Sequence, residues 1–291
     1  MNLSVILCAA IQWDKVGIVL GLIAGVAIVL AVAILIITKL CHIQEDEKVL
    51  KVIEHLAGAN CGGCGYSGCE GFAKGLCSGK ACLNDCKVTS NAEKAKIAQI
   101  ANLEFAAESP TVAVVRCNGG DAAQNKFDYI GNQDCVSEML FHNGQKVCTT
   151  ACLGLGSCTK VCPVGAIKVV EKKAIVDPSI CTSCGNCLKT CPRVCIERIP
   201  ATAPVYVACH SHCKGKEVMG QCSNGCIACG LCARNCPQKA IEMVDNLPVI
   251  DYTKCTGCKT CVIKCPKHVI KVHGEILTEE KSKALDKQNK K

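Results

Sequence analysis

The chain has 291 residues, 30 of them cysteine, and aromatic residues make up only 3%. Cysteine at about a tenth of a chain is typical of a disulfide-linked secreted domain or of a metal protein. Here many cysteines lie at two-residue gaps, and several thiols on one short turn cannot all find disulfide partners, which excludes a disulfide scaffold. The formal net charge of +8 does not indicate nucleic-acid binding, because the basic residues are scattered and aromatic residues that stack on bases are almost absent.

An uninterrupted apolar stretch without charged residues runs from Val16 to Thr38. It is long enough to cross a bilayer as one helix. It is also longer than the apolar core of a cleavable signal peptide, and no clear cleavage region follows it. We therefore predict that residues 1–40 form an uncleaved membrane anchor. Because metal-binding thiols must stay reduced, the residues after Lys39 are expected to lie in the cytoplasm.

The first cysteine group follows a short, predicted amphipathic helix. It reads Cys61-Gly-Gly-Cys64-Gly-Tyr-Ser-Gly-Cys69, with Cys86 further along the chain. A glycine-rich loop can fold tightly enough for three of its thiolates to bind one iron–sulfur cluster, and a distant fourth completes the set. The sequence therefore predicts a small 4Fe-4S domain over residues 41–90.

A duplicated module occupies most of the chain after this domain. Eight cysteines recur at a constant offset of 74 residues, without a gap. Such self-similarity marks a repeated structural unit. The matching residues are Cys148, Cys152, Cys158, Cys162, Cys181, Cys184, Cys187 and Cys191 in the first copy and Cys222, Cys226, Cys232, Cys236, Cys255, Cys258, Cys261 and Cys265 in the second.

The spacing C-x2-C-x2-C-x3-C-P begins at Cys181, Cys226 and Cys255. In a two-cluster ferredoxin, the first three thiolates of this motif bind one 4Fe-4S cluster and the fourth binds the neighbouring cluster. Zinc sites pair two cysteine doublets instead, so the spacing favours iron–sulfur clusters over zinc. This crossed ligation predicts three complete sets: Cys162 with Cys181, Cys184 and Cys187; Cys265 with Cys226, Cys229 and Cys232; and Cys236 with Cys255, Cys258 and Cys261.

The remaining ferredoxin cluster departs from the pattern. The position that matches Cys229 is Leu155 in the first copy, so Cys152, Cys158 and Cys191 lack one thiolate. The nearest candidate is Cys148, which we expect to complete this set. Together with the first cysteine group, the motifs predict five 4Fe-4S clusters.

Several further cysteines leave a sixth cluster open. One example would combine Cys209, Cys213 and Cys222 with Cys195, whereas the alternative is that such residues are buried thiols that pack as small apolar side chains. The stretch before Cys117 resembles the stretch before Cys209, so each module is expected to begin with a strand that ends in cysteine. The candidates for further clusters are Cys117, Cys135, Cys195, Cys209, Cys213 and Cys222.

Other residues carry weaker signals. His210 and His212 lie between Cys209 and Cys213 in the sequence Cys-His-Ser-His-Cys and leave a mixed metal site open. Gly154 and Gly156 lack the third glycine and the preceding strand of a dinucleotide fingerprint, so we expect no NAD or flavin site and no catalytic residue on this chain. Four cysteines are interpreted as bystanders: Cys8, Cys41, Cys77 and Cys82.

The predicted fold class is α+β, with one N-terminal transmembrane helix, a small Cys-rich 4Fe-4S domain and two tandem bacterial-type two-cluster ferredoxin modules. Metal centres are expected to stabilise these small domains in place of a large apolar core. The predicted domain bounds are 1–40 for the anchor, 41–90 for the 4Fe-4S domain, 91–134 for a connecting segment, 135–200 for the first ferredoxin module, 201–273 for the second and 274–291 for the tail.

The chain resembles the B subunit of the Rnf complex, the ion-translocating ferredoxin:NAD oxidoreductase, in which this iron–sulfur subunit is the electron inlet. The likeness rests on the anchor, on the loop from Cys61 to Cys69, and on the segment from Ala151 to Pro163 with the ferredoxin modules after it. It covers nearly the full chain and points to the longer, multicluster form of the family. The resemblance implies a translocase subunit in the cell membrane that takes low-potential electrons from soluble ferredoxin. Membrane-embedded and flavin-bearing partner subunits would then reduce NAD and export Na+ or H+.

A soluble ferredoxin donor is expected to be acidic, and basic residues of the second module could attract it. The candidates are Lys254, Lys259, Lys264 and Lys267. Two alternative functions remain: a polyferredoxin subunit of another membrane-bound reductase or hydrogenase complex, and a metal-binding scaffold without redox activity.

Overall fold

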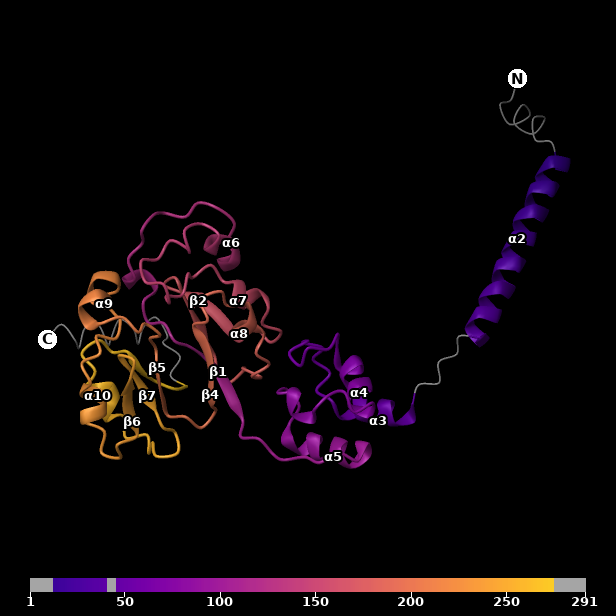
Figure 1. Ribbon diagram of the computed structural model, residues 1–291. Helices are drawn as coiled ribbons and strands as arrows, with labels where there is room; N and C mark the ends of the chain where they lie inside the picture. Colours follow the sequence, from indigo (N-terminus) through magenta and orange to yellow (C-terminus); the bar gives the residue numbers. More distant parts are fainter. Residues whose placement is uncertain (1–12, 41–45, 275–291) are drawn as a thin grey trace, which may run out of the picture. The chain divides into compact units, whose positions relative to one another are not determined.

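The computed structural model describes residues 13–40 and 46–274 (Figure 1). The described residues fall into two units, which divide after Glu47. The first unit contains the long helix α2 (Trp13–Leu40), in which the apolar stretch Gly17–Ile37 is long enough to cross a membrane and is not buried by the other described residues. The predicted apolar helix is therefore confirmed. Cys8 and Cys41 lie outside the described residues.

The small cysteine-rich domain has a helical core. Val52, Phe72 and Ile97, one from each helix, are almost completely buried in one apolar cluster. The last helix begins at Asn91. Its N-cap residue is Ser90, whose hydroxyl accepts a hydrogen bond from the amide of Glu93. This helix packs into the same core although it lies beyond residue 90, where the sequence predicts the end of the domain. The elements are α3 (Glu47–His55), α4 (Cys69–Cys77), the 3-10 turn η1 (Leu83–Asp85) and α5 (Asn91–Ala101).

Each ferredoxin module contains a two-stranded antiparallel hairpin. The pairs are β2 (Ile167–Val170) with β3 (Lys173–Val176), and β6 (Ile241–Val244) with β7 (Leu247–Ile250). The turn residues Glu171 and Lys172, like Asp245 and Asn246, have positive φ angles, as two-residue type I′ turns require. The short helices beside the hairpins are α7 (Ser157–Lys160), α8 (Asn186–Thr190), α10 (Leu231–Arg234) and α11 (Thr260–Ile263).

A second antiparallel pair joins the beginning of each module to its end. The pairs are β1 (Thr111–Val115) with β4 (Ile196–Pro200), and β5 (Val205–Val207) with β8 (Ile270–Val272). Because β1 pairs with the last strand of the first module, it packs as part of that module, although the sequence analysis places it in a connecting segment. Cys117 and Cys209 follow β1 and β5 after one intervening residue.

The two modules contact each other through the segments that follow these strands. The amide of Gln124 donates to the carbonyl of Gln221 at 2.9 Å, and the amide of Ser223 donates to the carbonyl of Ala122 at 3.2 Å. The elements in these segments and in the loop before Cys148 are η2 (Gly120–Ala122), α6 (Cys135–Met139) and α9 (Gly215–Gln221).

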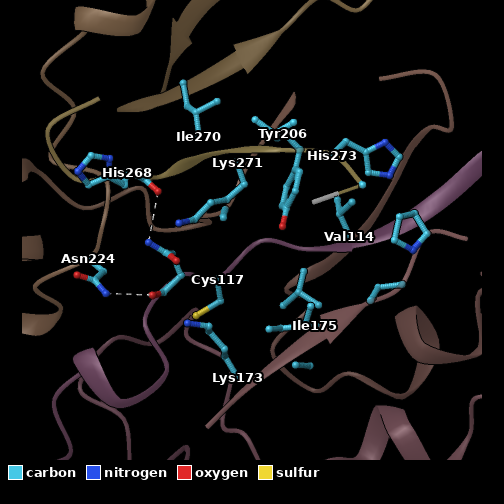
Figure 2. Close-up of a pocket in the computed structure, with 18 of the residues that line it drawn as sticks. Val114, Cys117, Lys173, Ile175, Tyr206, Asn224, His268, Ile270, Lys271 and His273 are labelled. Carbon is cyan, nitrogen blue, oxygen red and sulfur yellow. Dashed lines mark hydrogen bonds between the residues drawn. The ribbon is translucent and has the colours of Figure 1, made fainter. Parts of the chain in front are cut away.

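A cavity of about 290 Å³ lies between the two modules. Figure 2 shows Cys117 and Lys173 of the first module on its wall, together with Asn224 and His268 of the second. Asn118 joins the two sides, since its side-chain amide donates to the carbonyl of His268 and its own carbonyl accepts from Asn224, each at 3.5 Å. The mixed helix and strand content and the tandem modules confirm the predicted α+β fold class.

Candidate metal centres

The first cysteine group surrounds one small cavity. Cys61, Cys64, Cys69 and Cys86 line it together with glycine backbone and Phe72. The loop that carries the first three thiols turns through three glycines with positive φ angles, which residues with a side chain rarely adopt. Burial raises the pKa of the Cys61 thiol. The structure thus brings together the four cysteines that the sequence assigned to this centre.

Two of the crossed ferredoxin sets also line one cavity each. A glycine with a positive φ angle, Gly185 in one set and Gly230 in the other, precedes the helix that carries the third thiol. This turn brings three thiols to one side, and a cysteine from the other half of the module joins them. The two cavities are lined by Cys162, Cys181, Cys184 and Cys187, and by Cys226, Cys229, Cys232 and Cys265.

The third crossed set lies partly at the surface of the second module. Cys261 is buried, and Cys236 and Cys255 pack against the same apolar core, whereas Cys258 is exposed. The hydroxyl and the amide of Thr260 lower the pKa of Cys258. A lower pKa favours the thiolate, which is the form that binds metal.

The remaining cavity of the first module contains a cysteine that the sequence analysis did not place there. Cys152, Cys158 and Cys191 line it, as the crossed pattern predicts. Cys135 lines it with them, and Cys148 does not. The structure therefore brings Cys135, rather than Cys148, to the position left open by the missing thiolate.

Hydrogen bonds at the start of α6 hold Cys135 in this cavity. Its amide donates to the hydroxyl of Ser157 at 2.7 Å, and that hydroxyl donates to the carboxylate of Asp134 at 2.6 Å. Cys148 lies elsewhere because the amide of the residue before it donates to the carbonyl of Gln124. Spacing alone could not indicate Cys135, since a long loop separates it from the other three thiols.

Cys195 is a fifth thiol on the wall of this cavity. It is 1% exposed, and its sulfur lies 3.5 Å from the sulfur of Cys191. The corresponding residues after the other cysteine–proline steps are Ala166, Ala240 and Val269, whose amides donate to the preceding cysteine sulfur. Cys195 thus occupies the place of a small apolar residue. The thiol of Cys195 shares hydrogen bonds with the sulfurs of Cys152 and Cys191. These bonds raise the pKa of Cys195 and lower the pKa of Cys152 to about 7 and that of Cys191 to about 6.

The donor sets fit iron–sulfur clusters better than single metal ions. Within residues 13–40 and 46–274, no three His, Cys, Asp or Glu side chains lie close enough to hold one ion. The thiols instead surround cavities, as the corners of a 4Fe-4S cube require. Backbone amides also donate to several of these sulfurs, an interaction that tunes such clusters.

Other residues singled out in the sequence lie apart from these cavities. The rings of His210 and His212 contact each other edge to face, with their centroids 5.8 Å apart, and Nδ1 of His212 is hydrogen-bonded to the carbonyl of Asp245. The described residues therefore do not assemble a mixed His and Cys metal site there. Cys77, Cys82 and Cys213 are among the cysteines that line none of the four cavities described above.

Two family models match the cysteine-rich regions. The FeS family, described as an Fe-S cluster domain, matches residues 56–88. The Fer4_7 family, described as a 4Fe-4S dicluster domain, matches residues 151–195 and 225–269. The two matches of the second family fall on the two copies of the repeat.

Three relatives, each the B subunit of its complex, are similar over most of the chain. The B subunit of the Na+-translocating ferredoxin:NAD+ oxidoreductase complex of Acetobacterium woodii is 37% identical over 87% of this chain and 74% of its own length. The B subunit of the ion-translocating oxidoreductase complex of Methanosarcina acetivorans is 34% identical over 87% of this chain and 97% of its own length. The B subunit of the proton-translocating ferredoxin:NAD+ oxidoreductase complex of Clostridium ljungdahlii is 41% identical over 78% of this chain and 82% of its own length. With its cysteine-lined cavities and tandem ferredoxin modules, the chain belongs to the B-subunit family of ion-translocating oxidoreductase complexes and is an electron-transfer subunit that carries 4Fe-4S clusters.

Proposed function

We propose that the chain accepts low-potential electrons from reduced ferredoxin and relays them to partner subunits that reduce NAD and export Na+ or H+. The relatives from Acetobacterium woodii and Clostridium ljungdahlii are named as subunits of ferredoxin:NAD+ oxidoreductase complexes, which supports this proposal. The observation that carries it is the contact between the first cysteine group and the first ferredoxin module. A bound 4Fe-4S cluster takes up and releases one electron without making or breaking a substrate bond.

Five ligand sets follow from the cavities and the crossed motif. In each of four sets the thiols line a cavity of their own. The fifth set is assigned from the spacing of its cysteines. We assign Cys61, Cys64, Cys69 and Cys86; Cys135, Cys152, Cys158 and Cys191; Cys162, Cys181, Cys184 and Cys187; Cys226, Cys229, Cys232 and Cys265; and Cys236, Cys255, Cys258 and Cys261.

The first set lies directly against the first ferredoxin module. Cys184, a proposed ligand in that module, also lines the cavity of the first set. Two side chains of α8 hold the contact: the amide of Asn186 donates to the carbonyl of Cys61 at 2.7 Å, and the ammonium of Lys189 donates to the carbonyl of Gly63 at 2.9 Å. Neighbouring clusters at these two sets would be close enough for direct electron exchange.

The set that includes Cys258 is the proposed inlet for electrons, because this thiol is exposed. Lysines surround the set. Lys254 forms an ion pair with Asp251 at 3.0 Å, whereas Lys259 and Lys264 are exposed. Free ammonium groups beside an exposed cluster would attract an acidic ferredoxin on the cytoplasmic side.

Reversing the two exposed charges tests this inlet. In the variant with Lys259→Glu and Lys264→Glu, we expect reduction by ferredoxin to slow by about tenfold at low ionic strength, because the electrostatic attraction is lost. Stopped-flow absorbance under anaerobic conditions measures the rate. Lys216→Glu, on α9, makes the same kind of charge change and should have little effect. An unchanged rate that is also insensitive to salt would rule out this docking surface.

Replacing Cys195 by alanine tests whether Cys195 is a cluster ligand or only a hydrogen-bond donor to Cys191. Alanine occupies the corresponding position in Ala166 and Ala240, so the variant should keep its full iron content. Loss of the donated hydrogen bond to Cys191 should make the reduction potential of the adjacent cluster more negative, since hydrogen bonds to sulfur stabilise the reduced state. A redox titration followed by EPR measures this shift, with Cys213→Ala as the control. Loss of iron in Cys195→Ala would identify Cys195 as a ligand.

The electron donor is tested by mixing the full-length, anaerobically prepared chain with reduced ferredoxin. We expect the visible absorbance of the chain to bleach as its clusters are reduced. If dithionite bleaches the chain and reduced ferredoxin does not, ferredoxin is not the donor.

A further inference from the structure

Four cysteines outside the five ligand sets gather where the two ferredoxin modules meet. Cys148 and Cys222 belong to one buried cluster with Ala123, and Cys117 packs against it. Burial is the main cause of the raised pKa of the Cys222 thiol, and the thiols of Cys148 and Cys209 raise it further. Cys209, which is also buried, therefore lies beside this cluster. Two of these cysteines come from each module.

The backbone leaves space between these sulfurs. A Cβ atom placed on Gly119 would lie 3.3 Å from the sulfur of Cys222 and 3.5 Å from the sulfur of Cys117. The two sulfurs, one from each module, therefore face the same small volume. Figure 2 shows Cys117 at the edge of the inter-module cavity, on the segment that leads to this glycine.

The four thiols form two equivalent pairs in the repeat. Cys148 and Cys222 correspond at the offset of 74 residues. Cys117 and Cys209 occupy the same place after β1 and β5, and each sulfur accepts a hydrogen bond from a backbone amide, from Cys152 at 3.3 Å and from Cys226 at 3.4 Å. These distances match the amide–sulfur contacts at Cys162, Cys236 and Cys265, which are proposed cluster ligands.

A buried lysine beside the four thiols indicates that the site holds negative charge. Lys146 is 1% exposed, and its ammonium donates to the carbonyls of Gly120 and Ala123 at 2.8 and 3.0 Å. In the part of the chain that the structure describes, no carboxylate forms an ion pair with it. A buried ammonium with only carbonyl partners is costly. An iron–sulfur cluster with four thiolates is a net anion and would stabilise this charge.

We propose that Cys117, Cys148, Cys209 and Cys222 bind a sixth 4Fe-4S cluster between the two ferredoxin modules. The proposal rests on the proposed function, because it assumes that the other cavities hold clusters. The site adjoins a proposed ligand set in each module. Its sulfurs on Cys117 and Cys209 accept hydrogen bonds from the amides of Cys152 and Cys226, which are themselves proposed ligands of those sets. A cluster here would connect the electron path of the second module to that of the first. Four thiols that packed only as apolar side chains would require neither the amide donors nor the buried lysine.

The iron content of the wild-type chain gives the first test. Full-length protein, purified in detergent and reconstituted without oxygen, should contain about 24 iron and about 24 sulfide per chain, because each cluster holds four of each. A content of about 20 would overturn the sixth cluster and leave the five proposed sets standing. A chain without iron would reject the proposed function as well.

Variants give the second test. Cys222→Ser should lose about four iron atoms per chain and keep the others, because serine rarely replaces a thiolate ligand of this kind. Cys213→Ser, in the same module and outside every proposed set, should keep the full content. The double variant Cys135→Ser with Cys148→Ser should lose about eight iron atoms, since the two residues serve different clusters. Full iron in Cys222→Ser, or a loss of only four in the double variant, would overturn the assignment; if Cys222→Ser does not fold, the wild-type count decides.

Discussion

The variant Cys135→Ser is expected to lose one complete cluster from the first ferredoxin module. Cys135 lines the same cavity as Cys152, Cys158 and Cys191, and Leu155 occupies the place where the repeat supplies a thiolate. Without a fourth thiolate the cluster should be lost or converted to a form with less iron, so that the content falls by up to about four atoms per chain. Iron and sulfide analysis and EPR of the reduced protein measure this loss.

The functional effect of Cys135→Ser should be large, because the affected set lies within the module that joins the first cysteine group to the second module. We expect electrons from ferredoxin to reach the second module and to pass much more slowly to the first group. Cys195→Ala is the matched control for the iron content, since it changes a thiol in the same cavity and should keep the cluster. Cys213→Ser, outside every proposed set, is the control for the transfer rate. If Cys135→Ser keeps the iron content and the transfer rate of the wild type, another residue completes this set.

Enlarging Gly63 should separate the first cysteine group from the first module. A Cβ atom on this residue would lie 2.6 Å from the carbonyl oxygen of Cys184 and 3.4 Å from its Cβ atom, so the backbone would have to move. We expect Gly63→Ala to destabilise the contact by about 1–3 kcal/mol, the usual cost of overpacking. The hydrogen bonds from Asn186 and Lys189 to this loop should weaken with it.

Electron exchange between the two sets should slow in Gly63→Ala, while the iron content stays at the wild-type value. Freeze-quench EPR after mixing with reduced ferredoxin can follow the arrival of electrons at the first set. Gly220→Ala is the control, because a Cβ atom there would contact nothing within 4 Å. Equal rates in Gly63→Ala and the wild type would show that this contact does not carry electrons.

The sequence predicts those sites whose geometry is local. In each crossed set, three thiols lie on one short turn, so the spacing C-x2-C-x2-C determines where they point, and the duplicated modules identify the fourth. The glycine-rich loop at Cys61 is similar, because its three thiols lie within nine residues of one another. For these reasons the structure gathers the predicted thiols of four sets with a single exchange, Cys135 for Cys148.

Contacts between distant segments could not be predicted in the same way. Cys135 reaches its cavity through the bonds of Ser157 and Asp134, which no spacing rule encodes. The pairing of β1 with β4 places Cys117 between the modules, because residues far apart in the chain meet in one sheet. The sequence also offers Cys209, Cys213 and Cys222 with Cys195 as an example of a further set, but Cys195 lines the cavity that contains Cys191.

EPR spectroscopy of the full-length chain, prepared without oxygen and reduced with dithionite, tests most directly whether the cysteine groups hold clusters that exchange electrons. We predict a brown protein that bleaches on reduction and gives overlapping signals broadened by interaction between neighbouring 4Fe-4S clusters. A colourless protein that stays silent after reduction, although it is folded and its thiols are intact, would contradict the assignment of these cysteines.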